Sequence, residues 1–384
     1  MKNVLKYIFN LSLMLCITAS CIDEYNADLG DSDSNILVVE GNILSDEFCQ
    51  FYLTHSIGIN EVGLNKEHLY INDATLRVVG SDGSSYEAKK IYPGYGVQVG
   101  TLNPNVKYSL EITWDGAVFT TEPAFPLQTP KIDSMSYRQD SITGQVGIMV
   151  TEEAPNSKDP IYLRWFFDET WEIHSHYHPA FVYDPLKDNM RSIEEEEKKF
   201  VGWKYGSSSS IIVGNSAKFD NNHIRDFRIQ SIDVTSDRLE QYYCIDVRQY
   251  AMSRAQYEYE LARREISDEM GGIFAPLPSE LFTNITCNDN KHRAIGYVGV
   301  GMLQRGQLWI NSQYVTYRDA LYKYIEIITD EELLKLTPKE LYDIGYRITD
   351  DTEPMDGVWH WANQRGVDVT LRGASLVRPE WWHY

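Results

Sequence analysis

Apolar and polar side chains alternate without interruption in one stretch of the sequence, Val106-Lys-Tyr-Ser-Leu-Glu-Ile-Thr-Trp114. Successive side chains of a β-strand point to opposite faces, so this pattern predicts a strand with one buried face and one wet face. The pair Asp115-Gly116 that follows predicts a tight turn. Similar short runs lie at 36–43, 51–53 and 75–79, with a second turn signal at Asp82-Gly83. Together they predict a mainly β fold that begins with an immunoglobulin-like β-sandwich over residues 36–124.

A second β-rich domain is predicted over residues 125–320, because three prolines punctuate the boundary and strand-like runs resume after them. It should contain one helix near 253–270, started by a capping box of Ser253 and Gln256 and ended by Gly271-Gly272. The apolar face of this helix is predicted to hold Ala255, Tyr259, Ala262 and Ile266. The segment from about 179 to 210, with its charge run Glu194–Lys199, is predicted to be a long solvated loop and not a binding site.

Residues 321–384 are predicted to form a helical and aromatic tail. Two capping boxes, Thr329 with Glu332 and Thr337 with Glu340, predict short helices, and Pro338 suits the first position of the second one. The adjacent Trp381 and Trp382 are expected to bury their rings and so fasten the C-terminus to the body of the protein.

The first twenty residues carry Lys2 and Lys6, then an apolar run, then small residues before Cys21. This order predicts a secretory signal peptide over residues 1–20. Its apolar run of about 11 residues falls short of the roughly 20 that a membrane-spanning helix needs. We therefore predict a lipoprotein that is cleaved before Cys21 and acylated there, although Thr18 stands where leucine is commoner. The alternative is an ordinary secreted protein with an incidental cysteine.

Residues 21–35 are acidic and have little to bury, so they are predicted to form a solvated tether. Asp23 and Glu24 resemble an export signal that sends lipoproteins to the outer face of the outer membrane. The whole chain has 35 basic and 56 acidic residues, a net charge of −21. So negative a surface repels phosphate backbones, and we expect no nucleic-acid partner.

Beyond the leader and Cys21 there are three cysteines, Cys49, Cys244 and Cys287, and none belongs to a Cys-x-x-Cys pair. A disulfide between Cys244 and Cys287 is possible in an oxidising envelope. His174, His176 and His178 form the one histidine group considered for a metal, because alternation on a strand would put all three on one face. Their spacing of about 7 Å would be wide for one zinc ion. A polar strand edge is the favoured interpretation.

The sequence contains no nucleophile elbow, no His-Glu-x-x-His pair and no phosphate-binding glycine loop. We therefore predict a protein that is not an enzyme and has no cofactor, although two glycosidase carboxylates could lie far apart in the chain. Tyr92 and Tyr95, which flank Pro93-Gly94 in an expected turn, are the candidate binding aromatics. The alternative is that they fill the core, as most aromatic side chains do.

Several segments in this order resemble one known family. They are the leader with the run from 36 to 43, the stretches 211–220 and 253–259, Gly272-Ile-Phe-Ala-Pro-Leu-Pro, Asn284-Ile and Gly296-Tyr-Val-Gly. Together they resemble the Bacteroidetes lipoproteins of domain of unknown function 4249, over roughly residues 21–310. In that family the tail often carries cysteines. Here Val367, Asp368 and Val369 stand before Arg372-Gly373, so a tail disulfide is absent.

The resemblance implies an outer-membrane lipoprotein that faces the cell exterior, because members are typically encoded beside TonB-dependent outer-membrane transporters. The expected function is that of a non-enzymatic accessory to such a transporter, with its lipid anchor in the membrane and an unknown ligand. The alternative is a surface-anchored enzyme acting on glycans or peptides, or an adhesin. The family supplies no catalytic residues to carry over.

Overall fold

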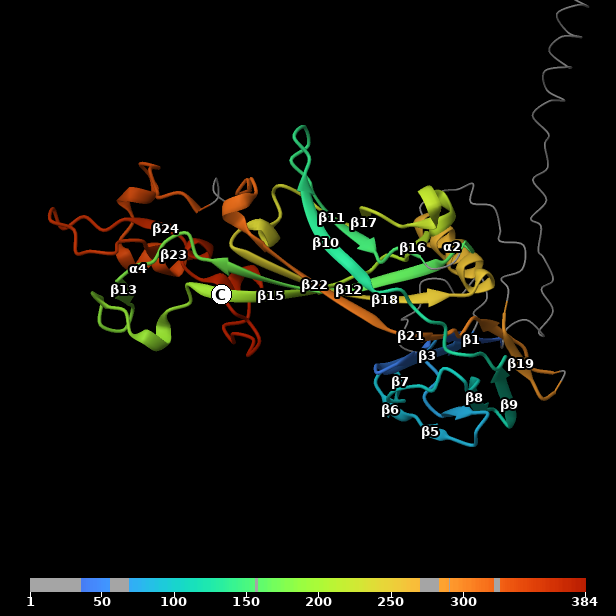
Figure 1. Ribbon diagram of the computed structural model, residues 1–384. Helices are drawn as coiled ribbons and strands as arrows, with labels where there is room; N and C mark the ends of the chain where they lie inside the picture. The colour runs from blue at the N-terminus through green and yellow to red at the C-terminus, as the bar shows by residue number, and fades with distance from the viewer. Residues whose placement is uncertain (1–35, 56–68, 156–157, 270–282, 290, 321–324) are drawn as a thin grey trace, which may run out of the picture.

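The computed structural model describes residues 36–55, 69–155, 158–269, 283–289, 291–320 and 325–384. It confirms a mainly β protein. The leader, the tether with Cys21 and the pair Gly271-Gly272 lie outside the described residues. Figure 1 shows the N-terminal strands packed beneath one end of a long central sheet, with the C-terminal part at the other end. None of the helices in the described part of the chain combines the length and the hydrophobicity of a membrane-spanning segment.

Two five-stranded sheets form the N-terminal part. The first has the order β20 (Ala294–Gly296), β1 (Leu37–Glu40), β3 (Phe48–His55), β7 (Gly94–Gln98) and β6 (Lys89–Ile91). The second has the order β19 (Ile285–Cys287), β9 (Ala117–Thr121), β8 (Tyr108–Trp114), β4 (Thr75–Gly80) and β5 (Ser85–Glu87). Between the sheets lies one apolar core that includes Phe51, Leu110 and Phe119. The predicted alternation is confirmed in β8, where Tyr108, Leu110 and Ile112 are buried.

The immunoglobulin-like arrangement is not confirmed. Each sheet takes an edge strand from residues 285–296, and β1 pairs with β20 in parallel. A further parallel pair, β2 (Ile43–Ser45) with β21 (Val300–Met302), also joins segments more than 250 residues apart. Residues 36–124 therefore do not complete this sandwich, because strands from far along the chain close its edges.

The central part also has two sheets around a core. The larger one has the order β15 (Val201–Ser207), β12 (Tyr162–His174), β18 (Tyr242–Met252) and β22 (Gln304–Asn311), with β16 (Ile212–Asn215) also paired to β12. The smaller one has the order β10 (Ile132–Gln139), β11 (Val146–Glu152) and β17 (Phe227–Ile232). Trp165, Ile148 and Val247 are fully buried between them. Since β18 and β12 are long, this sheet spans the molecule and links its two ends (Figure 1).

The predicted helix is present as α2 (Arg254–Glu269). Only half of its predicted capping box forms, because Ser253 Oγ accepts the N–H of Gln256 while the Gln256 side chain donates to Asn42 Oδ1 at 2.8 Å. Ala255 is exposed, so its predicted place on the buried face was wrong, whereas Tyr259 is buried as predicted. Ala262 is partly buried, and the side chain of Ile266 lies outside the described part.

The segment predicted as a long loop is instead ordered into strands. Its first half is a hairpin of β13 (Phe181–Asp184) and β14 (Asn189–Ser192), followed by the short 3-10 helix η4 (Glu195–Glu197). Its second half enters the large central sheet as β15. The charge run is compatible with this structure because Glu197 forms an ion pair with Arg191 on the hairpin.

The C-terminal part contains α4 (Pro338–Asp343) and the pair β23 (Tyr346–Ile348) with β24 (Trp361–Asn363). Its small core combines Tyr183 of β13 with four buried residues from the tail, Ile328, Leu341, Ile348 and Trp361. The capping box of Thr337 and Glu340 is confirmed. The box at Thr329 is not, because Asp330 accepts the N–H of Glu332 in its place, ahead of a short 3-10 helix η9 (Leu333–Lys335).

The last residues dock on the central sheet. Trp382 is 3% exposed and donates its indole N–H to Glu172 Oε2 at 2.9 Å, so this tryptophan does fasten the C-terminus. Trp381 stays 45% exposed. Cys49, Cys244 and Cys287 are all free thiols, so the possible disulfide between Cys244 and Cys287 does not form. The reason is their placement, since one lies in β18 of the central sheet and the other in β19 of the sandwich.

Candidate functional site

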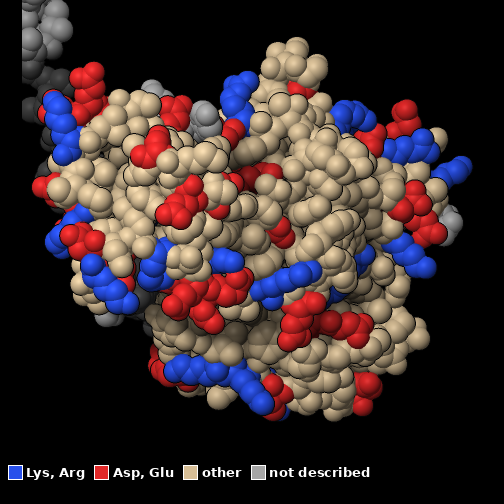
Figure 2. Space-filling view, turned by 90° about the vertical axis from the view of Figure 1, so that its left-hand side faces the viewer, with Lys and Arg blue, Asp and Glu red and all other residues tan. Residues whose placement is uncertain are grey.

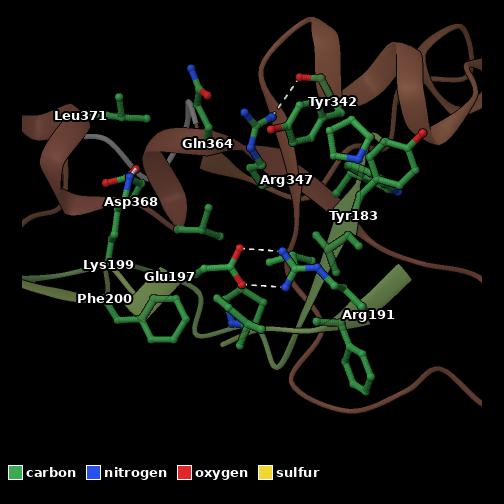
Figure 3. A pocket seen from close by; sticks show the side chains of 18 of the residues that line it. Tyr183, Arg191, Glu197, Lys199, Phe200, Tyr342, Arg347, Gln364, Asp368 and Leu371 are labelled. Atoms are coloured by element: carbon green, nitrogen blue, oxygen red, sulfur yellow. Dashed lines mark hydrogen bonds and ion pairs between the residues drawn. The ribbon is translucent and has the colours of Figure 1, made fainter. Parts of the chain in front are cut away.

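A pocket of about 460 Å³ lies between the β13–β14 hairpin and the C-terminal part (Figure 3). Hairpin residues and the approach to β15 form one wall, which includes Phe181, Arg191, Glu197 and Lys199. The opposite wall is formed by Tyr342, Arg347, Ile348, Trp361, Gln364, Val367, Asp368 and Leu371. Its volume lies within the range of about 300–1,000 Å³ that is typical of small-ligand sites.

A bidentate ion pair fixes one wall of this pocket. Arg191 Nη1 and Nη2 donate to the two carboxylate oxygens of Glu197 at 2.7 and 2.6 Å (Figure 3). Such paired, parallel hydrogen bonds fix the relative orientation of both groups. The hydrogen bonds from Arg191 lower the pKa of Glu197 to about 2. Glu197 is therefore a carboxylate at neutral pH and has no proton to supply to a ligand.

Lys199 is held in a similar way, since its Nζ donates to Asp368 Oδ2 at 3.1 Å. The other oxygen of Asp368 accepts the N–H of Thr370 and caps the 3-10 helix η11 (Val369–Arg372). Two of the three carboxylates that line the pocket, Glu197 and Asp368, are thus already occupied by cations and N–H groups of the chain, and the third, Glu196, is exposed to solvent. This arrangement favours a binding wall over acid–base chemistry.

Arg347 differs from the other two cations of the pocket. Its Nη1 donates to the carbonyl oxygens of Tyr342 and Tyr346 at 2.9 and 2.7 Å. Its guanidinium carbon lies 3.8 Å from the centre of the Tyr342 ring, a cation–π contact. Burial lowers its pKa. In Figure 3 the guanidinium group lies between Gln364 and Tyr342.

Among the described residues, no carboxylate forms an ion pair with Arg347. Of its two terminal nitrogens, only Nη1 donates to an acceptor among the residues that the structure describes, so the group retains unused donors beside the pocket. A guanidinium group presents its donors in a planar fork that matches a carboxylate or phosphate. Arg347 is therefore the group in this pocket that could hold an anion.

A second hollow, of about 760 Å³, separates the sandwich from the central sheet. It is larger, but each of its three arginines already has a carboxylate partner. Arg164 pairs with Glu260, Arg263 with Glu40, and Arg248 with both Asp168 and Glu47. The pairs with Glu40 and Glu47 connect the sandwich to α2 and to the central sheet. Because these arginines are already paired, we assign the candidate ligand site to the pocket with Arg347.

The end of the molecule that carries this pocket faces the viewer in Figure 2. Lysine and arginine side chains are mixed with aspartate and glutamate across it, with no broad field of one sign. The strong negative charge of the whole chain therefore does not prevent an anionic ligand from approaching this end.

The three histidines considered for a metal do not share one face of a strand. Strand β12 ends at His174, so His176 and His178 do not continue its alternation. His174 Nε2 lies 2.7 Å from Glu172 Oε1, while the His178 ring stacks on Phe200 at 5.1 Å. Within the described residues, these three do not bring their ligand atoms within 4.8 Å of one another.

The two tyrosines considered for binding have different surroundings. Tyr92 is 71% exposed, as expected for a turn residue. Tyr95 is only 3% exposed, and its hydroxyl accepts the N–H of Ala74 at 2.9 Å. Tyr95 thus belongs to the sandwich core, because β7 places it on the inner face opposite Phe51 of β3. It was a wrong candidate for ligand contact.

The residues of the pocket itself were not found from the sequence. Arg191 and Glu197 lie in the segment that was predicted to be a solvated loop, and Arg347 follows α4 without any motif. The one available signal was the capping box at Thr337, which fixes the helix that carries Tyr342. It places the ring beneath Arg347 but says nothing of the hairpin across the pocket.

Comparison with known families gives one match, to the model of a domain of unknown function (DUF4249), over residues 22–305. No curated protein matches the chain. The match includes the sandwich, the hairpin wall of the pocket and all of β12 and β18, and it ends inside β22, ahead of the wall with Arg347. Because it spans well over half of the chain, the protein belongs to the family of the domain of unknown function DUF4249.

Proposed function

We propose that this protein is a non-enzymatic outer-membrane lipoprotein, anchored at Cys21 and facing the cell exterior, that presents a nutrient to a TonB-dependent transporter. The observation that carries the proposal is the open pocket with Arg347, whose cation has no carboxylate partner among the described residues. Of the three carboxylates that line the pocket, Glu197 and Asp368 are neutralised by Arg191 and Lys199, and Glu196 is exposed to solvent. This chemistry suits binding of a ligand.

The position of the pocket agrees with a lipid anchor at the other end. The first described strand, β1, begins soon after Cys21 in the sequence and lies at the sandwich end of the molecule (Figure 1). The pocket lies at the opposite end, beside β13, β23 and α4. A chain tethered near β1 would therefore hold the pocket away from the membrane, where a ligand arriving from outside could enter.

The ligand class follows from the lining. Arg347 offers free donors for a carboxylate, and the aromatic rings of Phe181, Phe200 and Tyr342 offer apolar surface beside it. A short peptide with a free C-terminus carries both features. A hydrogen bond to a charged group typically contributes about 1.5–3 kcal/mol, which corresponds to roughly 10- to 100-fold in affinity.

Calorimetric titration with short apolar peptides tests the ligand site. We expect peptides with a free carboxylate to bind and their C-terminal amides to bind at least about tenfold more weakly. Arg347→Gln should remove this difference. Arg365→Gln is the matched control, since Arg365 is exposed and does not line the pocket. Equal binding of acids and amides by the unaltered protein would disprove the ligand assignment.

The anchor and the partner are tested in the native host. Cys21→Ala should release the protein from the membrane fraction or leave it unprocessed, and alanines at Asp23 and Glu24 should reduce its exposure to protease added outside the cell. Gentle extraction of the lipidated form should co-purify a transporter, since a stable contact buries at least about 1,000 Å². Recovery of the lipoprotein alone, together with turnover of a glycan or peptide, would favour the enzyme alternative.

A further inference from the structure

Cys287, Asp289 and His292 lie close together at the far edge of the sandwich, on and just after β19. One ligand atom from each lies within 4.8 Å of the others. His292 Nδ1 is 2.9 Å from Asp289 Oδ2, and Cys287 Sγ is 3.8 Å from Asp289 Oδ1. All three side chains are partly exposed, so an ion from solution can reach them.

The fold positions each of these groups from the backbone. Cys287 is fixed by β19, in which it pairs with Phe119 of β9. Asp289 Oδ1 accepts the N–H groups of Lys291 and His292, both at 2.9 Å, which fixes the turn between the carboxylate and the imidazole. The His292 ring also meets the Phe119 ring edge-on, with 6.2 Å between centres.

A second carboxylate supports the imidazole from its other side. His292 Nε2 lies 3.5 Å from Asp115 Oδ2, in the turn between β8 and β9. Histidines that bind metals through one ring nitrogen usually donate the other N–H to a carboxylate, which sets the tautomer and strengthens the ligand. His292 Nδ1 faces Asp289 and is therefore the nitrogen that would bind a metal, while the N–H on Nε2 would donate to Asp115.

The donor set indicates which ion would fit. Calcium and magnesium take mainly oxygen ligands, whereas a thiolate, an imidazole and a carboxylate suit Zn²⁺ and similar transition metals. With metal–ligand distances of about 2.0–2.3 Å, ligand atoms around a tetrahedral zinc are roughly 3–4 Å apart. Asp289 Oδ1 lies 3.0 Å from His292 Nδ1 and 3.8 Å from Cys287 Sγ, and both distances fall within this range.

We propose that Cys287, Asp289 and His292 form a binding site for a zinc-like divalent transition metal, with Asp115 supporting His292. Three protein ligands leave a fourth position for water or for a group from another molecule. The site lies in the sandwich and shares no residue with the Arg347 pocket. The metal proposal therefore does not depend on the proposed peptide ligand.

The test uses the full mature protein after treatment with a chelator. Zn²⁺ is titrated while the alkylation rate of the accessible thiol is followed, and Co²⁺ is titrated while the thiolate-to-cobalt absorption is recorded. Among the described cysteines, Cys49 and Cys244 are 3% and 1% exposed, and the proposed lipidation blocks the thiol of Cys21. Alkylation of the folded, lipidated protein therefore reports on Cys287. We expect one equivalent of Zn²⁺ to slow alkylation at least tenfold, and Co²⁺ to develop the thiolate band.

Variants identify the ligands. Asp289→Asn and His292→Gln should abolish the protection, while Asp115→Asn should weaken metal affinity about 10- to 100-fold. The matched control is His360→Gln, because His360 forms a similar exposed pair with Asp350, at 2.7 Å, without a cysteine. It should bind Zn²⁺ like the unaltered protein. Failure of stoichiometric Zn²⁺ to protect Cys287, or unchanged Zn²⁺ affinity in Cys287→Ser, would overturn the proposal.

Discussion

The sandwich and the central sheets differ in what they bury. Among the described residues 36–124, the buried side chains with polar character are serine and threonine, the tyrosines Tyr95 and Tyr108 and the thiol of Cys49. The central sheets instead bury three carboxylates, Glu152, Glu169 and Glu172, each less than 10% exposed. A buried charge is costly unless partners within the protein replace its water. The central part must therefore be held together by specific polar contacts as well as by apolar packing.

These contacts join segments that are distant in the sequence. Glu169 receives hydrogen bonds from Arg238, Tyr243 and Gln230. Glu172 receives the indole N–H of Trp382 from the end of the chain. Glu152 accepts fewer hydrogen bonds, since Gln249 donates to one of its oxygens and the other oxygen has no hydrogen-bond partner. Glu172 thus holds the C-terminal tail on the central sheet, whereas Glu152 keeps a buried oxygen that no hydrogen bond satisfies.

The largest expected effect comes from removing the anchor of the tail. Trp382→Ala should lower the free energy of unfolding by about 3–5 kcal/mol, because it deletes a buried indole and leaves a buried oxygen of Glu172 without its donor. Urea unfolding followed by circular dichroism measures this loss.

Trp381→Ala is the matched control, since the neighbouring ring is 45% exposed and should cost less than about 1 kcal/mol. Equal losses in the two variants would mean that the contact with Glu172 does not hold the tail to the central sheet.

The second largest change in stability is expected at the buried carboxyl of Glu152. Burial raises the pKa of its carboxyl from 4.5 to about 7. The folded protein therefore keeps the proton up to about pH 7, while the unfolded chain loses it above about 4.5. Stability must fall as the pH rises from about 4.5 to 7 and stay lower above that. Glu152→Gln removes this loss, so it should stabilise the protein by up to about 3 kcal/mol at pH 8 and have little effect at pH 4.

Thermal or urea unfolding at both pH values measures the difference. The neighbouring Glu153 is exposed, so Glu153→Gln provides a control that should not change the pH dependence. A glutamine at 152 can still accept the hydrogen bond from Gln249 Nε2, so its packing is retained. A stabilisation that is the same at pH 4 and pH 8 would contradict the assignment of this carboxyl as the titrating group.

The same contrast explains what the sequence could predict. In the sandwich, apolar residues face inward and polar residues outward, so the alternation around Leu110 identified both a strand and its buried face. On β12, Glu169 lies on the face that packs into the central core, whereas Glu172 lies on the opposite face and is buried beneath Trp382 of the tail. A pattern of hydrophobicity predicts that both residues are exposed. The partners that make their burial possible, such as Trp382, become neighbours only through the tertiary fold.

The residues of the candidate site could not be predicted from the sequence, for a related reason. Arg191 and Arg347 line the same pocket from positions far apart in the chain, and neither belongs to a local motif. Turn chemistry and caps are local, and there the sequence succeeded at Thr337 and Glu340. It failed at Thr329, because Asp330 next to it competes for the same N–H group. Local patterns thus predicted elements, whereas the site depends on how remote elements meet.

A smaller effect is expected within the sandwich. Tyr95→Phe removes the hydroxyl that accepts the N–H of buried Ala74, and an unpaired buried donor costs about 1–3 kcal/mol. Tyr92→Phe should be neutral, since that ring is 71% exposed. Unfolding in urea compares the two variants. A cost at position 92 as large as that at 95 would show that Tyr92 contacts more than solvent.

The smallest effect should fall on the pocket side of the molecule. Thr337 Oγ1 accepts the N–H of Glu340 at 3.3 Å, and Glu340 Oε2 accepts the N–H of Thr337 at 2.8 Å. Thr337→Ala removes half of this box and should cost about 1 kcal/mol. Because α4 carries Tyr342, whose ring lies under Arg347, amide exchange should rise in α4 and β23 and peptide affinity should fall less than tenfold.

Two further variants separate capping from side-chain loss. Thr337→Ser keeps the capping oxygen and should behave like the unaltered protein. Thr329→Ala, at the box that the structure does not form, should also be neutral because Asp330 supplies the acceptor there. The sandwich strands share no residue with this helix, so their amide exchange should not change in any of the three variants. Faster exchange in β3 or β8 of Thr337→Ala would mean that the small C-terminal core and the sandwich unfold as one unit, although they are separate clusters of buried residues.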